Sequence, residues 1–205
     1  MKDKLKKYSG ISLALGGVFT FLINAGLTPF MQIGDSGVDV AVSNIFLWRQ
    51  SLSALTAIFL FIGIVGVYER QINKAGRFGV FSFLIAFIGS AMLLAQEWNQ
   101  IFFVRDLAIR APETMLALDA GKEFALPEIG SIIVFSFFAL GWILFSISTI
   151  LAKVYRKKGP ILIIAGFFAT PILTAILPGF LGMTLGNAIL SAGWVLMGLE
   201  RFRSV

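Results

Sequence analysis

The polar side chains that could do chemistry in this chain lie close to the ends of long apolar stretches. Arg49, Ser53 and Thr56 are four and three residues apart, so on a helix they share one face, with Gln50 beside them. An ionisable residue within a membrane span is expensive and is therefore a candidate for function. This group predicts a polar stripe in the outer half of one helix.

A second polar group ends the third apolar stretch, where Gln96, Glu97 and Gln100 share a helical face and Trp98 points away as an interfacial anchor. Two asparagines lie at comparable depth in the first and sixth stretches. Together these residues predict an outward-facing polar cavity that binds a small molecule, a lipid head group or an ion. The predicted ligand-binding residues are Asn24, Arg49, Gln50, Ser53, Gln96, Glu97, Gln100 and Asn187.

Arg49 and Glu97 are predicted to pair in this cavity. Arg49 begins one apolar stretch and Glu97 ends the next, and the short connection between these stretches makes them antiparallel neighbours. A charge just below a membrane surface is best satisfied by an opposite charge. The alternative interpretation is a structural polar clasp, or side chains that snorkel to the interface.

Several kinds of site are excluded by composition. The chain has no cysteine and no histidine, which excludes disulfides, His- or Cys-ligated zinc, His-ligated haem and a Ser-His-Asp triad. The central layer of the apolar stretches has no Lys, Arg, Asp or Glu, and no phosphate-binding glycine motif is present. We therefore expect no enzyme, no catalytic residues, no metal and no cofactor.

The elements that must position the polar groups are membrane helices. Hydrophobic residues make up 58% of the 205 residues and charged residues 14%, against about 45–50% and 25% in soluble domains. Stretches of ~20 apolar residues are long enough to span a bilayer. The sequence predicts one all-α integral membrane domain over residues 1–205, a polytopic bundle of six transmembrane helices at Ile11–Met31, Ile45–Val67, Phe78–Ala95, Ile132–Leu151, Ile161–Leu177 and Phe180–Leu199.

Basic residues predict the orientation of the bundle. With the N-terminus inside, all of the 17 Lys and Arg residues except Arg49, Arg105, Arg110 and Lys122 fall on the inner side. This bias is the positive-inside pattern of a multi-pass cell-membrane protein with both termini in the cytoplasm. The net charge of +6 is thereby assigned to membrane anchoring, and no nucleic-acid partner is expected.

The long connection after the third apolar stretch is predicted to be partly helical. Trp98 to Asp106 either continues the third helix or bends along the interface, and Pro112–Ala120 forms a short interfacial helix that starts at its proline. This connection is either a functional loop or a lid over the helix ends.

Small residues on the last stretch predict close helix packing. Gly182 and Gly186 are four residues apart, as are Ala188 and Ala192, and this spacing lets helix backbones approach closely. Pro178 and Gly179 separate the last two stretches, which predicts a tight antiparallel hairpin. The small-residue face packs within the chain or, as the alternative, forms a homodimer.

Short signals across most of the chain resemble a group of uncharacterised small multi-pass membrane proteins of bacteria and, loosely, the DUF4386-type proteins. The segments that carry the resemblance are Val67–Gln71, Ala75–Gly79, Gln96–Trp98, Arg110–Glu113, Gly141–Trp142, Gly159–Pro160 and Gly193–Trp194. The resemblance implies a compact helical bundle in the cell membrane and implies no activity.

Two classes of function stay open at this point. One is a binding protein, or a small transporter, that uses the outer cavity for a membrane lipid or a small-molecule ligand. The other is a structural or accessory subunit that packs against a homo-oligomeric or other membrane-protein partner. A transporter should show a polar path to the cytoplasm, and the inner half of the stretches has no charged residue to form one.

Overall fold

A computed structural model describes residues 2–31, 36–119 and 126–203, which fold into helices joined by short connections. In chain order these are α1 (Lys2–Leu22), the π-helix η1 (Ile23–Leu27), the 3-10 helix η2 (Thr28–Phe30), α2 (Gly37–Val42), α3 (Asn44–Gln71), α4 (Gly76–Asn99), the π-helix η3 (Gln100–Val104), α5 (Arg105–Arg110), α6 (Pro112–Asp119), α7 (Leu126–Ala152), α8 (Lys158–Ile176) and α9 (Leu181–Arg203).

Six helical segments of the described chain are long and apolar enough to cross a membrane. They are Lys7–Phe30, Asn44–Gln71, Gly76–Arg110, Ile129–Ala152, Lys158–Ile176 and Leu181–Arg203. The predicted all-α bundle of six transmembrane helices is therefore confirmed. Pro171 lies inside α8, which nevertheless runs without a break from Lys158 to Ile176.

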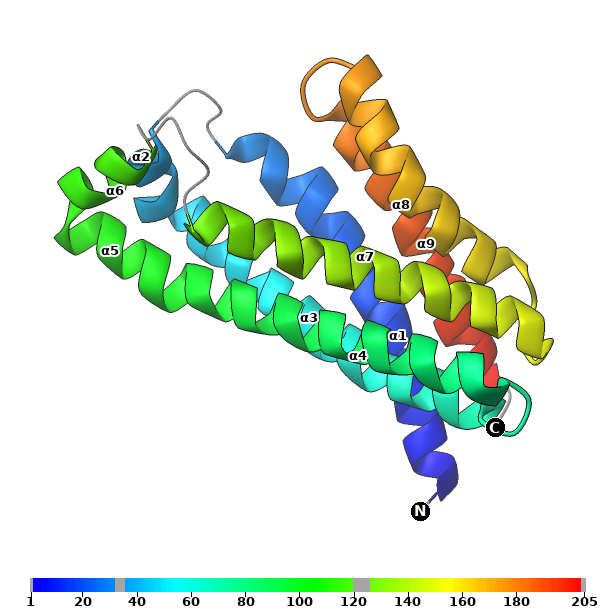
Figure 1. Cartoon of the computed structure of the whole chain (residues 1–205). Coiled ribbons are helices and arrows are strands. Elements are labelled where there is room, and N and C mark those ends of the chain that lie inside the picture. The colour runs from blue at the N-terminus through cyan, green and yellow to red at the C-terminus, as the bar shows by residue number, and fades with distance from the viewer. Residues whose placement is uncertain (1, 32–35, 120–125, 204–205) are drawn as a thin grey trace.

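The third span is much longer than a membrane requires. Its 35 residues, Gly76–Arg110, run through α4, η3 and α5 as one rod, which at 1.5 Å per residue is about 50 Å long. The rod continues the third helix and does not turn back along the interface, and it ends beside α6 at the extremity farthest from both chain termini (Figure 1). The predicted helix Pro112–Ala120 is present as α6 up to Asp119, and Ala120 lies outside the described residues.

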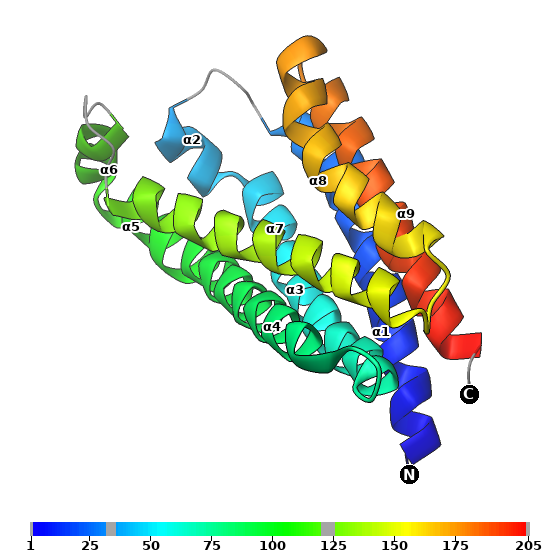
Figure 2. The same ribbon diagram turned by 45° about the vertical axis from the view of Figure 1, so that its right-hand side comes forward.

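The long helices form two groups that diverge toward the end of the molecule away from both termini, which we call the distal end. Helix α9 packs along both α8 and α1, and α4 packs along both α7 and α3. The groups meet through α1 against α3, and through a lighter contact of α7 with α8. Figures 1 and 2 show both termini at the end where the groups converge.

An aromatic cluster fills the region where the two groups converge. Trp142 and Trp194 are 0% and 1% exposed, and their rings meet edge to face at 5.4 Å. Phe138 and Phe145 pack against Trp142. The indole nitrogen of Trp142 donates to Ser90 Oγ at 3.2 Å, so its polar atom is satisfied inside the core. The cluster forms a buried apolar layer where the two groups converge.

The distal end is held by its own small core. Phe46, Ala41 and Ala108 are buried together where α3, α2 and α5 meet. Arg105 donates to the carbonyl oxygens of Ala41 and Ser43 at 2.9 and 2.7 Å, which fixes α5 against the start of α3. These contacts hold the distal end of the rod formed by α4, η3 and α5 beside α2 and the start of α3.

Candidate functional site

A partly open cavity of about 490 Å³ lies between the two groups of helices in the distal half of the molecule. Each of the six spanning helices contributes to its wall. The wall includes all eight side chains that the sequence predicted, namely Asn24, Arg49, Gln50, Ser53, Gln96, Glu97, Gln100 and Asn187. Side chains from five separate elements are thus brought to one space.

The α3 wall of the cavity carries the predicted polar stripe. Arg49, Gln50, Ser53 and Thr56 all line it, as their helical spacing indicated. Arg49 Nε donates to Thr28 Oγ1 at 3.1 Å, and Arg49 Nη1 donates to Gln50 Oε1. The guanidinium is therefore held in place by a neighbour on its own helix and by the segment that ends the first span.

The α4 wall carries the acidic group. Glu97 is 7% exposed, and its Oε2 atom has no hydrogen-bond partner among the described residues. Its neighbour Gln96 donates to Ser131 Oγ at 2.9 Å, which joins α4 to α7 across the cavity. Trp98 points away as predicted, since it is 59% exposed and packs on Phe102.

The predicted direct ion pair of Arg49 and Glu97 is not formed. The two side chains line the same cavity and act on each other electrostatically, but no salt bridge among the described residues joins them. Thr28 and Gln50 instead hold the guanidinium through its Nε and Nη1 atoms. Thr28 reaches Arg49 because η1 and η2 carry the chain past the start of α3, and helix periodicity gives no sign of that contact.

Both π-helical segments of the described chain supply a polar residue to the cavity, Asn24 from η1 and Gln100 from η3. Single π turns inside α-helices occur frequently at functional sites. The amide of Asn24 donates to Thr20 O at 2.8 Å, and that of Asn187 donates to Met183 O at 2.9 Å. Each asparagine therefore keeps its amide oxygen as a further acceptor at the cavity.

The floor and one side of the cavity are apolar and were not predicted. They include Leu60, Leu93, Phe138, Phe167, Leu190 and Trp194. Leu60, Leu93 and Leu190 do lie three or four residues from Thr56, Glu97 and Asn187, on the helix faces that these polar residues mark. Phe138 and Phe167 lie on α7 and α8, for which no polar cavity residue was predicted. The missed polar residue Thr20, which also lines the cavity, carries a signal too, because it lies four residues from Asn24 on the same helical run.

The predicted small-residue face of α9 divides into two parts. A Cβ atom on Gly182 would lie 2.2 Å from Leu173 O, and one on Gly186 would lie 2.4 Å from Thr170 Cα, so both glycines lie directly against α8. Ala188 is half-buried and Ala192 is exposed, so the alanine pair does not continue this contact. The difference arises because the helix rotates by 100° per residue, and Leu190 and Gly193 take the buried positions instead.

Comparison of the chain with protein-family models, with curated proteins and with solved structures found no match. The spanning helices make the chain an integral membrane protein, and its distal cavity is the candidate site for a function.

Proposed function

We propose that the protein binds a small amphipathic molecule or a lipid in the distal cavity. The observation that carries the proposal is the two-part wall of the cavity: charged and amide side chains gather toward the distal end, and leucine and aromatic side chains form the base. Ligand sites are typically concave and largely apolar, with a few polar groups that fix the orientation of the ligand.

The side of the cavity between α7 and α8 favours a ligand that arrives from the membrane. α7 packs closely on α4 and only lightly on α8, and the two helices diverge toward the distal end (Figure 2). Phe135 on α7 lines the cavity and is 52% exposed, and Pro171 lines it from α8. An apolar chain could leave the cavity on this side while the polar head stays inside.

We assign the distal end to the outer side of the cell membrane and both termini to the cytoplasm, on the positive-inside bias. The test uses single cysteines at two exposed positions, Thr114 in α6 and Asn73 between α3 and α4. Thr114→Cys should react with a membrane-impermeant thiol reagent in intact cells, and Asn73→Cys only after permeabilisation. The native chain has no cysteine, so it gives no background. Reversed labelling would place the cavity on the cytoplasmic side.

Tryptophan fluorescence tests the binding proposal. Trp48 and Trp98 are 66% and 59% exposed, so Trp48→Phe with Trp98→Phe leaves only the buried Trp142 and Trp194. Trp194 lines the cavity. A lysophosphatidylethanolamine with bromine on its acyl chain, added to the protein in maltoside micelles, should quench the remaining fluorescence in a saturable way.

A cavity-filling variant supplies the control. Ala139→Leu adds bulk to the cavity wall and should weaken quenching, whereas Ala192→Leu adds the same bulk to an exposed site on α9 and should leave quenching unchanged. Absence of quenching in the parent protein, or equal quenching in all three proteins, would overturn the proposal.

The alternative of an accessory subunit that acts through helix packing has less support. The glycine face that could receive a partner helix is occupied by α8 of the same chain. The alternative of a transporter needs a path beyond the cavity, and the buried layer of Trp142, Phe145 and Ile64 lies between the cavity floor and the termini. Both observations favour binding at the distal end.

A further inference from the structure

The carboxylate of Glu97 has an unsatisfied oxygen within the described protein. Glu97 is only 7% exposed and lines the cavity. Its Oε2 atom accepts no hydrogen bond from the described residues. A buried carboxylate without a donor or a cation is costly. A group that enters the cavity with N–H donors or a positive charge would relieve this cost.

The guanidinium of Arg49 makes no salt bridge with this carboxylate in the described part of the chain. Hydrogen bonds to Thr28 and Gln50 use its Nε and Nη1 atoms. Nη2 has no partner in the described part of the chain, and its donors remain for an anionic group. Because Thr28 and Gln50 hold the guanidinium and neither of them binds Glu97, the cavity wall presents the positive group of Arg49 and the negative group of Glu97 at different points.

We infer that the cavity selects a zwitterionic head group, whose ammonium faces Glu97 and whose anionic group faces Arg49. The inference rests on the proposed function and names the chemical class of the ligand. A ligand with one charge would leave the opposite protein charge without a partner in a region of low dielectric. The amide oxygens of Asn24 and Asn187 add acceptors for the three N–H donors of an ammonium.

The same chemistry is offered by a phospholipid head group and by a free zwitterion. Four brominated single-chain probes with one common acyl or alkyl chain separate charge from hydrophobicity: a lysophosphatidylethanolamine, a lysophosphatidylglycerol, an alkylamine and an alkyl maltoside. Quenching in the Trp48→Phe, Trp98→Phe protein should be tightest for the zwitterion, by about tenfold or more over each of the others, as expected for a charge-assisted contact.

Competition by phosphoethanolamine, which has the zwitterion without a chain, separates the two sources. Displacement of the brominated zwitterion by this soluble compound at millimolar concentration identifies a free zwitterion as sufficient. If the brominated lysophosphatidylethanolamine stays bound in the presence of phosphoethanolamine and keeps its tenfold preference over the other probes, the ligand is a lipid head group. Equal affinity for all four brominated probes would overturn the charge inference while leaving the cavity as a binding site, and no quenching by any probe would overturn the proposed function itself.

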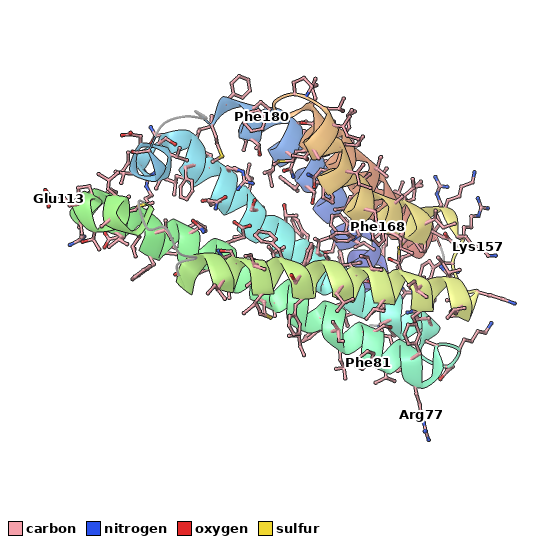
Figure 3. All side chains as sticks on the ribbon, turned by 45° about the horizontal axis from the view of Figure 1, so that its top comes forward. Arg77, Phe81, Glu113, Lys157, Phe168 and Phe180 are labelled. Carbon is pink, nitrogen blue, oxygen red and sulfur yellow. The ribbon has the colours of Figure 1, made fainter. Side chains whose placement is uncertain are left out.

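Single variants test which protein side chain recognises each charge of the ligand. Glu97→Gln should abolish the preference for the zwitterion over the anionic probe, a loss of about ten- to a hundredfold, and should leave affinity for the anionic probe unchanged. Arg49→Met should abolish the preference over the alkylamine. The control is Glu113→Gln, the same chemical change at an exposed site on α6, far from the cavity at one extremity of the molecule (Figure 3). A preference that survives Glu97→Gln would overturn the inference, and if a variant fails to fold, the probe series on the unmodified cavity still tests it.

Discussion

Replacement of Gly186 by leucine should destabilise the protein by forcing α9 away from α8. A Cβ atom at this position would lie 2.4 Å from both Thr170 Cα and Thr170 Oγ1, about an ångström inside the 3.4 Å at which ordinary contact begins. One of these atoms is backbone, so a side-chain rotation cannot relieve the collision and α8 must move. The leucine carries three further carbons into the same space.

The expected loss follows from two opposing effects. Overpacking of a close contact costs about 1–3 kcal/mol, and the exchange of glycine for leucine in a helix returns somewhat less than about 1 kcal/mol. Because the collision involves backbone, the upper part of the overpacking range applies, and the net loss is about 1–2 kcal/mol. Ala192→Leu, on the exposed side of the same helix, should change stability by less than about 0.5 kcal/mol.

Reversible unfolding in mixed micelles, followed by tryptophan fluorescence, measures both variants against the parent protein. We expect a lower midpoint for Gly186→Leu and an unchanged midpoint for Ala192→Leu. A Gly186→Leu protein as stable as the parent, or an Ala192→Leu protein equally destabilised, would refute the assignment of the glycine face to the contact with α8.

Three further predictions concern the core and the end of the molecule near the termini. Trp142→Phe and Ser90→Ala should be coupled by about 0.5–1.5 kcal/mol in a double-mutant cycle of unfolding, because one hydrogen bond of 3.2 Å joins them; a coupling near zero would contradict that bond. Arg201→Met should destabilise more than Arg110→Met, by about 1.5–3 against 0–1 kcal/mol, because the Arg201 side chain is 3% exposed and that of Arg110 is 78% exposed; equal losses would contradict the burial of Arg201. Burial raises the pKa of Tyr155 from 10.0 to about 12, against the opposing effect of nearby arginines. The folded state therefore holds the phenol proton more tightly than the unfolded state does. The stability that this proton contributes is complete below pH 10 and is lost as the pH rises through about 12. Tyr155→Phe should remove that loss, together with one phenol from the ultraviolet titration; a difference titration centred at pH 10 would contradict the prediction.

Length and hydrophobicity were sufficient to predict the six spans, because a bilayer imposes a minimum run of apolar residues on every helix that crosses it. The helix Pro112–Asp119 was also predictable, since a proline favours the first helical turn. The extension of the third span through η3 to Arg110 could not be predicted, because Ile101 to Val104 is as apolar as an interfacial segment would be. Packing against α2 through Ala108 and Arg105 decides the outcome.

The polar lining of the cavity could be predicted because each polar residue stands out against an apolar helix. The partners of these residues could not, because they depend on how helices distant in the chain are placed. Arg49 was expected to bind Glu97, yet it binds Thr28, which the π-helical turn of η1 brings within reach. Part of the apolar wall had no signal for the same reason: Phe138 and Phe167 lie on α7 and α8, for which no polar cavity residue was predicted.

In the proposed complex, the distal cavity holds the head of an amphipathic ligand, and the chain of the ligand leaves between α7 and α8. Anomalous diffraction from crystals grown with brominated lysophosphatidylethanolamine tests this most directly, because the bromine positions locate the chain. We expect bromine peaks beside Phe135 and Pro171, which line that side of the cavity, with head-group density between Glu97 and Arg49. Bromine peaks confined to the outer lipid-facing surface, with a cavity that contains only solvent, would contradict this mode of binding.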